Sequence, residues 1–473
     1  MERAAGVFSK WVAEKHPAKR YVLVCGMGNN GGDGLAATRI LHNQYNSQVR
    51  VIIIKHGNTS SPDFDENLSR LAPYHIQPET IAKTGLLPTF DKDDIVIDAL
   101  LGSGLNRPVT KGILAEVIEW LNALPNTIIS IDIPSGLFAD KSSKGNIVCA
   151  DDTLSFEQPK SAFLFSENAQ YVKSFDYRSI GLDKSFIARS ETDYFFIDDV
   201  LAKSFYQPGK KFDHKGTYGH TLLAAGSKGK LGAAVLCTKA ALKSGAGLVT
   251  CHTICSGSDV LHTAVPEAML SFTDHEQWIT TFPKNNAYNV AAIGPGMGKN
   301  ALTAGALEKF IESFNGKLVL DADALNIIAE NPTLLDRLPA NTILTPHPKE
   351  FERLFGSFDD DFVRVEFLSK MCREKNRIVV LKGAHTAVGL TSGRVYFNST
   401  GNCGMSTAGS GDVLTGIIAG LLSRGYLPAH AALLGVYLHG LSGDIATETL
   451  GYESLIASDI IENLFLAFKT VKP

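Results

Sequence analysis

The sequence has almost no excess of either charge. Its 473 residues include 45 lysines and arginines against 49 aspartates and glutamates, a formal net charge of −4. A protein that binds nucleic acid or a membrane surface through bulk charge usually carries a clear basic excess. The bulk charge therefore does not suggest a nucleic-acid or membrane surface as a partner, although a local patch could exist.

The sequence also lacks paired cysteines. Its seven cysteines are an odd number, they are scattered, and none forms a Cys-x-x-Cys motif. This usage favours free thiols in a reducing compartment. Cysteines and histidines also lack the spacing of zinc ligands, so we expect no structural metal.

Long apolar runs are missing as well. No uncharged apolar run approaches the length that crosses a membrane. The first residues, "MERAAGVFSKWVAEKHPAKR", show neither the apolar core nor the cleavage site of a secretion signal. We therefore expect a cytoplasmic protein.

Short β-rich runs alternating with helical patterns dominate the first half of the chain. The hydrophobic fraction of 44% and the charged fraction of 20% are those of a globular protein. A helix is predicted over 34–44. Strands are predicted at 20–28, 49–55, 94–102 and 127–136. Unbroken Val/Ile runs between helices predict a doubly wound parallel sheet covered on both faces.

The second half repeats this α/β pattern. A helix is predicted over 232–247. Strands are predicted at 221–226, 248–254, 289–296, 317–323, 341–347 and 377–383. Residues 176–198 between the halves are polar and lack clear periodicity, which predicts a connector with a boundary near 195. The simplest architecture is two successive α/β domains.

The stretch "CGMGNNGGDG" at 25–34 follows a predicted strand and opens a predicted helix. Backbone N–H groups at such a turn can hold phosphate. The stretch matches neither Gly-x-Gly-x-x-Gly nor a P-loop. A tight turn with Asp33 as helix cap explains it equally well.

Two aspartates, Asp98 and Asp132, stand inside apolar runs and precede glycine-containing turns. An unpartnered buried carboxylate is costly, so each should meet a cation, a hydrogen-bond donor or a substrate. Capping or turn hydrogen bonds are the alternative for either residue.

The blocks "GMGNNGGDGLAATRIL", "DALLGSGLNRPV" and "SIDIPSG" resemble the NAD(P)H-hydrate epimerase domain over most of 1–180. The resemblance implies a potassium ion on Asn30, Asp98 and Ser135, and Asp132 at the reacting nicotinamide ring. It further implies contacts with the hydrated dinucleotide from Asn29, Asn30, Gly31, Gly32, Asp33, Gly102, Ser103, Gly104, Leu105, Asn106, Arg107 and Pro108. Members of that family carry a further segment before the first helix, so we expect a short N-terminus here.

The stretch "NCGMSTAGSGDVLTG" at 402–416 combines small residues with the start of a helix. Its N–H groups can form an anion hole, and the helix dipole favours the ionised form of Asp412. Beside a phosphoryl group, this aspartate could accept a proton from the attacking hydroxyl. The alternative is an ordinary aspartate in the first turn of a helix. In the same way, His347, which stands between two prolines, could be a simple turn histidine.

The second half resembles the ADP-dependent NAD(P)H-hydrate dehydratase, a branch of the ribokinase-like superfamily, over roughly 200–473. The blocks are "KGTYGHTLLAAGS", "KAALKSGAGLVT", "GPGMG", "DADALN", "TPHPKE", "VLKGAHT" and "AGSGDVLTG". Ribokinase relatives usually read G-A-G-D where this chain has Ser410 as the second residue, which fits the dehydratase branch. The resemblance implies that the hydrate faces Ala233, Gly296, His347 and Asp412. It implies that the adenine nucleotide contacts Lys382, Gly383, Ala384, His385, Thr386 and Gly411.

Together the resemblances imply a Rossmann-like epimerase domain at 1–190 and a ribokinase-like dehydratase domain at 196–473, each a three-layer sandwich. The first would interconvert the R and S hydrates, with Asp132 as catalytic residue. The second would dehydrate the S form with ADP and Mg²⁺, giving AMP and phosphate, with Asp412 as catalytic residue. The family also implies a homo-oligomer. Two alternatives remain: a kinase of a small vitamin alcohol or sugar, and a non-enzymatic binding role for the first domain.

Overall fold

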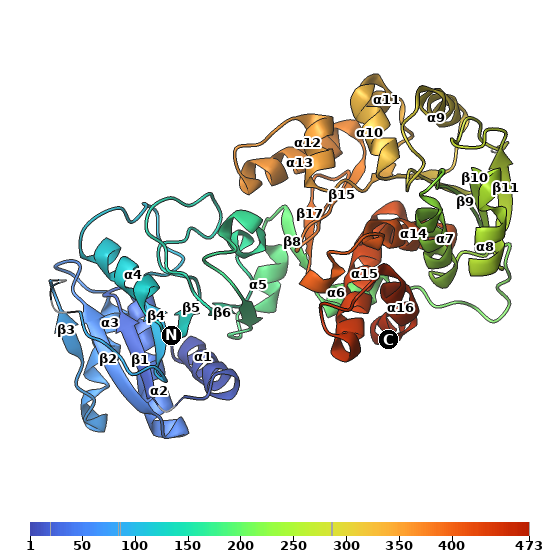
Figure 1. Cartoon of the computed structure of the whole chain (residues 1–473). Helices are drawn as coiled ribbons and strands as arrows, with labels where there is room; N and C mark the ends of the chain where they lie inside the picture. Colours follow the sequence, from blue (N-terminus) through green and yellow to red (C-terminus); the bar gives the residue numbers. More distant parts are fainter. Residues whose placement is uncertain (19, 84, 86, 285–286, 473) are drawn as a thin grey trace. The chain divides into compact units, whose positions relative to one another are not determined.

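The computed structural model describes residues 1–18, 20–83, 85, 87–284 and 287–472. The chain forms two compact units. One comprises Met1–Glu191 with Asp360–Phe362, and the other comprises Thr192–Asp359 with Val363–Pro473. The predicted α/β class is confirmed in both units (Figure 1).

The first unit is built on a seven-stranded sheet, as far as the described residues go, in the order β3-β2-β1-β4-β5-β6-β7. Every neighbouring pair is parallel. This confirms the predicted doubly wound sheet. The strands are β1 (Arg20–Cys25), β2 (Gln48–Ile54), β3 (Glu79–Ile81), β4 (Ile95–Ala99), β5 (Ile128–Ile131), β6 (Asp152–Phe156) and β7 (Phe175–Arg178).

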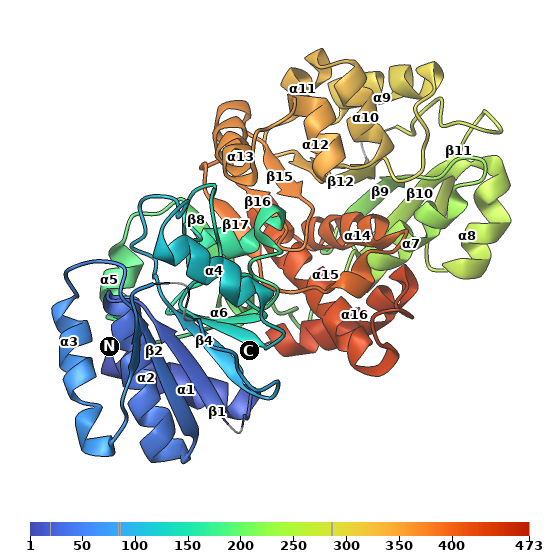
Figure 2. The same ribbon diagram turned by 60° about the vertical axis from the view of Figure 1, so that its left-hand side comes forward.

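Helices cover both faces of this sheet (Figure 2). Alternate residues of β1 serve the two cores: Leu23 packs with α1, α2 and α3, whereas Val22 and Val24 pack with α4. A strand buried on both faces needs apolar residues throughout, which explains its unbroken hydrophobic run. The helices are α1 (Glu2–Lys15), α2 (Asn29–Tyr45), α3 (Pro62–Ser69), α4 (Ile113–Ala123) and α5 (Lys184–Arg189).

The second unit contains a ten-stranded sheet, counted over the described residues, in the order β11-β10-β9-β12-β13-β14-β15-β16-β17-β8. It is parallel from β11 to β15, and β16 is antiparallel to both of its neighbours. The predicted strands are β9 (His220–Ala224), β10 (Leu248–Ile254), β12 (Val290–Ile293), β13 (Lys317–Leu320), β14 (Ile343–Leu344) and β15 (Ile378–Leu381). Sequence reasoning missed β8 (Tyr194–Ile197), β11 (Met269–Thr273), β16 (Ala387–Gly389) and β17 (Val395–Asn398).

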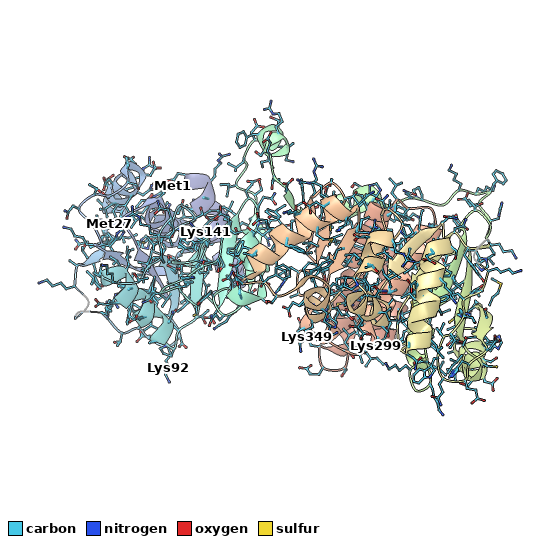
Figure 3. All side chains as sticks on the ribbon, turned by 90° about the horizontal axis from the view of Figure 1, so that it is seen from above. Met1, Met27, Lys92, Lys141, Lys299 and Lys349 are labelled. Atoms are coloured by element: carbon cyan, nitrogen blue, oxygen red, sulfur yellow. The ribbon has the colours of Figure 1, made fainter. Side chains whose placement is uncertain are left out.

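Two layers of helices enclose this second sheet. Figures 1 and 2 show α9 to α13 on one side of it and α7, α14, α15 and α16 on the other. Figure 3 looks onto the first layer and labels Lys299 and Lys349 there. The helices are α6 (Asp199–Phe205), α7 (Leu231–Lys243), α8 (Ser258–Ala264), α9 (Ala301–Ser313), α10 (Asp323–Glu330), α11 (Thr333–Arg337), α12 (Pro348–Phe355), α13 (Asp361–Lys375), α14 (Ser410–Ser423), α15 (Pro428–Leu450) and α16 (Ala457–Val471).

The reading of 176–198 as a plain connector was wrong in part. Its first residues form β7 at the edge of the first sheet, and β8 pairs in parallel with β17 at the edge of the second. Both are four-residue edge strands with little burial, so neither shows the hydrophobic pattern of a central strand. The two units divide just before the predicted boundary, between Glu191 and Thr192.

Within the described residues, no helix combines the length and the apolar character needed to cross a bilayer.

Close packing of α14 against α7 is the main helix–helix contact behind the second sheet. A side chain on Gly416 would press on the backbone oxygen of Cys237 and stand 2.7 Å from Ala240 Cβ. The absence of Cβ atoms along this face of α14 therefore sets how closely the two helices approach.

Gly416→Ala should lower the free energy of unfolding of the second unit by ~1–3 kcal/mol, because overpacking outweighs the gain in helix propensity. Gly305→Ala is the matched control, since no atom lies within 4 Å of a Cβ built on this α9 glycine. Chemical denaturation of the full chain measures both. Equal stability of the two variants would contradict the close-packing argument.

Candidate functional sites

A cavity of about 430 Å³ lies at the carboxyl edge of the first sheet. It opens where the strand order reverses, between β1 and β4, the usual ligand position in doubly wound sheets. Its lining comprises Gly28, Asn29, Asn30, Asp33, His56, Leu100, Leu101, Gly102, Ser103, Gly104, Leu105, Asn106 and Asp132. Most of the predicted dinucleotide residues thus share one cavity.

Four predicted contacts are not among the cavity's lining residues: Gly31, Gly32, Arg107 and Pro108. Gly31 instead permits close packing, since a Cβ there would overlap the backbone oxygen of Gly26. Sequence reasoning placed the helix start too late, because α2 already begins at Asn29. The Asp33 cap is also wrong: Gly28 is the N-cap residue and no side chain caps this helix.

Asp98 is fully buried and hydrogen-bonds to Leu100, which lines this cavity. Its carboxylate accepts hydrogen bonds from Ser130 Oγ (2.8 Å), the backbone N (2.8 Å) and Oγ (2.6 Å) of Ser135, and Leu100 N (3.2 Å). Burial raises the pKa of Asp98 although these donors favour the charged form. Of the predicted kinds of partner for this carboxylate, namely a cation, a hydrogen-bond donor or a substrate, the structure shows hydrogen-bond donors.

Asn30 carries an unsatisfied oxygen at the same place. Its Nδ2 donates to Ile131 O at 2.9 Å, which orients the amide, and its Oδ1 is buried with no hydrogen-bond partner among the described residues. A buried unpaired acceptor is costly. The side chain therefore fits a hard cation that prefers oxygen ligands, such as K⁺.

Asp132 follows β5 in a strained conformation, with φ of +67°. Its Oδ1 accepts hydrogen bonds from Lys160 Nζ at 2.8 Å and Phe156 N at 3.0 Å. Positive φ is uncommon outside glycine and is retained where the surroundings enforce it. The prediction that Asp132 meets a cation or a donor is confirmed by Lys160, a residue that sequence reasoning missed.

The second unit contains a larger cavity, of about 830 Å³. Three successive strands end there: β13 before Asp321, β14 before the turn with His347, and β15 before Lys382. All six predicted nucleotide residues line it, as do His347 and Asp412. Parallel strands bring these side chains together from distant parts of the sequence.

A buried ion pair forms the floor of this cavity. Lys382 Nζ lies 2.9 Å from Asp321 Oδ1, and Thr415 Oγ1 donates to Asp321 Oδ2 at 2.8 Å. Lys382 also approaches Glu350 Oε2 at 3.9 Å. Although burial disfavours the ammonium, the charges of Asp321 and Glu350 raise the pKa of Lys382.

Asp412 lies in the first turn of α14, as predicted. Burial raises its pKa to about 6, the charge of Asp321 adds to this, and Lys382 opposes it. The expected preference of the helix dipole for the ionised form is thus opposed by burial. A carboxyl with a pKa near neutrality can exchange protons at physiological pH.

Two histidines contact the N-terminal ends of helices at this cavity. His347 Nδ1 accepts from Lys349 N and Glu350 N, so it caps α12, and it lines the cavity as well. His439 Nε2 lies 3.0 Å from the Ser410 carbonyl oxygen at the start of α14. Burial lowers the pKa of His439 to about 4, so the ring is neutral.

Comparison with known proteins supports the family resemblance of each half of the chain. A family model described as NAD(P)H-hydrate dehydratase matches residues 221–465, and one described as YjeF-related protein N-terminus matches residues 1–162. The bifunctional NAD(P)H-hydrate repair enzyme Nnr of Moorella thermoacetica is 33% identical over 470 residues, covering 94% of this chain and 87% of that protein. Its counterpart in Thermofilum pendens is 33% identical over 464 residues, covering 95% and 87%.

The chain belongs to the bifunctional NAD(P)H-hydrate repair enzyme family.

Among solved structures, the ADP/ATP-dependent NAD(P)H-hydrate dehydratase from Bacillus subtilis, co-crystallised with ATP and Mg²⁺, is similar to the second unit. The TM-score is 0.53 at 29% identity, and the match covers 59% of this chain and 99% of that chain. Both resemblances read from the motifs are thereby confirmed at the level of the family.

Two residues that the family resemblance predicts to face the hydrate, Ala233 and Gly296, do not line the large cavity. Ala233 and Gly296 stand next to each other, since a Cβ on Gly296 would lie 3.1 Å from Ala233 Cβ. They follow β9 and β12, where the order of the second sheet reverses. The usual ligand position of such a sheet therefore adjoins both residues.

Sequence reasoning left Asp321, Glu350 and His439 without a role, although all three line the large cavity. Asp321 could have been found, because it follows an apolar strand in the quoted "DADALN" block. Glu350 and His439 lie within helices, where only tertiary packing decides which side chains reach the cavity.

Lys382→Met should lower the free energy of unfolding by ~3–5 kcal/mol, because it leaves the Asp321 carboxylate buried without its partner. Lys299→Met is the control. Lys299 pairs with Glu330 at 2.7 Å on the surface, and exposed pairs contribute ~0–1 kcal/mol. Adding Asp321→Asn to Lys382→Met should recover part of the loss. Equal losses in both single variants, measured by denaturation, would contradict the argument.

Proposed function

We propose that this chain repairs hydrated NAD(P)H: residues 1–190 epimerise the R and S hydrates, and residues 196–473 dehydrate the S form at the expense of ADP, giving AMP and phosphate. The observation that carries the proposal is the pair of separate cavities, each with a buried acidic residue at the carboxyl edge of a sheet. Family membership over both units supports the assignment.

The dehydratase chemistry follows from the leaving group. Hydroxide leaves poorly, whereas phosphate leaves well, so transfer of a phosphoryl group from ADP to the hydroxyl makes elimination possible. Asp412 would take the proton from that hydroxyl. The N–H groups at the start of α14 and the Lys382 ammonium would stabilise charge on the transferring phosphoryl group.

Magnesium would be held mainly by the nucleotide phosphates. The described residues contain no cluster of three or more His, Cys, Asp or Glu side chains that could form a protein cage, and Mg²⁺ usually binds substrate phosphates with few protein ligands. Bound Mg²⁺ supplies neutralisation of phosphate charge.

Asp412→Asn should reduce dehydration of the S hydrate by about 100-fold or more, because the general base is removed. In the unmodified chain, turnover at saturating substrate should rise with pH through about 6 and level off above it. Asp412 accepts a proton only when ionised, and its pKa is about 6 in the field of Asp321, Lys382 and Asp323. Turnover that falls as pH rises through 6 would contradict the role of base.

In the first unit, we propose that Asp132 reacts with the nicotinamide ring and that Asn30, Asp98 and Ser135 hold K⁺. A cation there would supply positive charge at the cavity floor. The dinucleotide would contact the residues implied by the family, Asn29–Asp33 and Gly102–Pro108. A homo-oligomer and a cytoplasmic location stay predictions.

Asp132→Ala should abolish R/S exchange and leave dehydration of the S form unchanged, because the two cavities belong to different units. Exchange is measured by chromatographic separation of the epimers, and dehydration by absorbance of reduced nicotinamide. Loss of both activities together with a lower melting temperature would point to a structural role for Asp132.

The whole proposal is tested by incubating an R/S hydrate mixture with the chain, Mg²⁺ and ADP. Full recovery of reduced-nicotinamide absorbance, faster than spontaneous epimerisation allows, is the expected result. A stable phosphorylated product without recovery would favour a small-molecule kinase. Recovery that stops once the S form is consumed would favour a non-enzymatic first unit.

A further inference from the structure

The cavity of the first unit contains a second carboxyl group whose surroundings differ from those of Asp132. Asp33 reaches it from the first turns of α2, whereas Asp132 reaches it from the turn after β5. Asp132 is paired with the Lys160 ammonium and accepts a backbone N–H. Asp33 has no hydrogen bond or ion pair to the part of the chain that the structure describes.

Burial raises the pKa of Asp33 to about 7; the N-terminal ammonium opposes this shift, and the charges of Asp132 and Asp63 add to it. One carboxyl is thus held beside a cation while the other favours its neutral form. Two carboxyl groups with different surroundings in one site are a usual arrangement of a general acid and a general base.

A further observation marks the cavity as a ligand site independently of these two acids. The Oδ1 atom of Asn30, a residue only 7% exposed, is unpaired among the described residues and belongs to the same lining. The carboxyl groups therefore face a space that is built to receive polar atoms.

We propose that Asp33 is a second catalytic residue of the epimerase, acting with Asp132 as an acid–base pair that opens and recloses the hydrated ring. This inference rests on the proposed epimerase function of the first unit. It assigns to Asp33 proton transfer, beyond the substrate contact implied by the family.

The step balances without an oxidant or a further reactant. Water adds to the ring with its hydroxyl on the carbon next to the nitrogen. Asp132 removes the hydroxyl proton, the C–O bond becomes a carbonyl, and the C–N bond breaks. Its electron pair goes to the ring nitrogen, which takes the proton of the Asp33 carboxyl.

Rotation of the open chain then presents the other face of the aldehyde to the nitrogen. The nitrogen attacks that face and returns its proton to the Asp33 carboxylate, while the new hydroxyl oxygen recovers the proton held by Asp132. Both carboxyl groups end in their starting states, and the carbon has inverted.

Asp33→Asn tests the inference in the full chain, with an R/S hydrate mixture, ADP and Mg²⁺. The unmodified chain should show a fast phase, as the S form is dehydrated, and a slower phase limited by epimerisation. In Asp33→Asn, the turnover of the slow phase should fall about 100-fold or more. The KM for the R hydrate and the rate of the fast phase should both stay within about threefold of their values in the unmodified chain.

Asp63→Asn is the matched control, because Asp63 acts on Asp33 only through its charge and is not in the cavity lining. It should keep a slow phase within about threefold of the unmodified chain. Hydroxylamine, which traps aldehydes as oximes, gives a second measurement: oxime formation should exceed the uncatalysed rate in the unmodified chain and fall to that rate in Asp33→Asn.

A slow phase that survives in Asp33→Asn, or a loss confined to KM, would overturn the catalytic role of Asp33. Absence of oxime from the unmodified chain during rapid epimerisation would overturn the ring-opening step. Absence of any slow phase beyond the spontaneous rate in the unmodified chain would instead overturn the proposed epimerase itself, and this inference with it.

Discussion

Parallel strand pairing is the constraint on which both units depend. Because each crossover returns the chain to the same end of the sheet, the carboxyl ends of the strands meet along one edge. In the first unit this edge brings Asp33 and Asp132 into one cavity, and Asp98 is buried against its lining residue Leu100. In the second it gathers Asp321, His347 and Lys382 from three successive strand ends. Neither set is close in sequence, and each is complete only when the sheet has formed.

The chemistry of each cavity then depends on which neighbouring groups offset the cost of burying a carboxylate charge. The charge of Asp98 is stabilised by four hydrogen bonds, and that of Asp321 by Lys382 and Thr415. Asp412 and Asp33 have weaker compensation, and burial raises their pKa values to about 6 and about 7. Aspartate thus has a structural role at Asp321, whereas the proposed role of Asp33 and Asp412 is proton transfer.

The two proposed reactions belong on one chain for a chemical reason. A dehydratase that accepts a single epimer leaves the other behind, so a partner that interconverts them makes repair complete. Each unit has its own sheet, core and cavity, and neither cavity includes residues of the other unit. The activities can therefore be removed separately, which a shared active site would not allow.

The sequence by itself determined the fold class, the two-unit organisation and many of the residues that line the two cavities. Unbroken apolar strands and glycine-containing turns are patterns of neighbouring residues, so they can be recognised from the sequence alone. Only the tertiary structure revealed Lys160 as the partner of Asp132, the ring of His439 at the start of α14, and β8 as a strand of the second sheet. It also showed that burial raises the pKa of Asp412. Ion pairs, edge pairing and desolvation join residues far apart in the chain, so no local pattern could specify them.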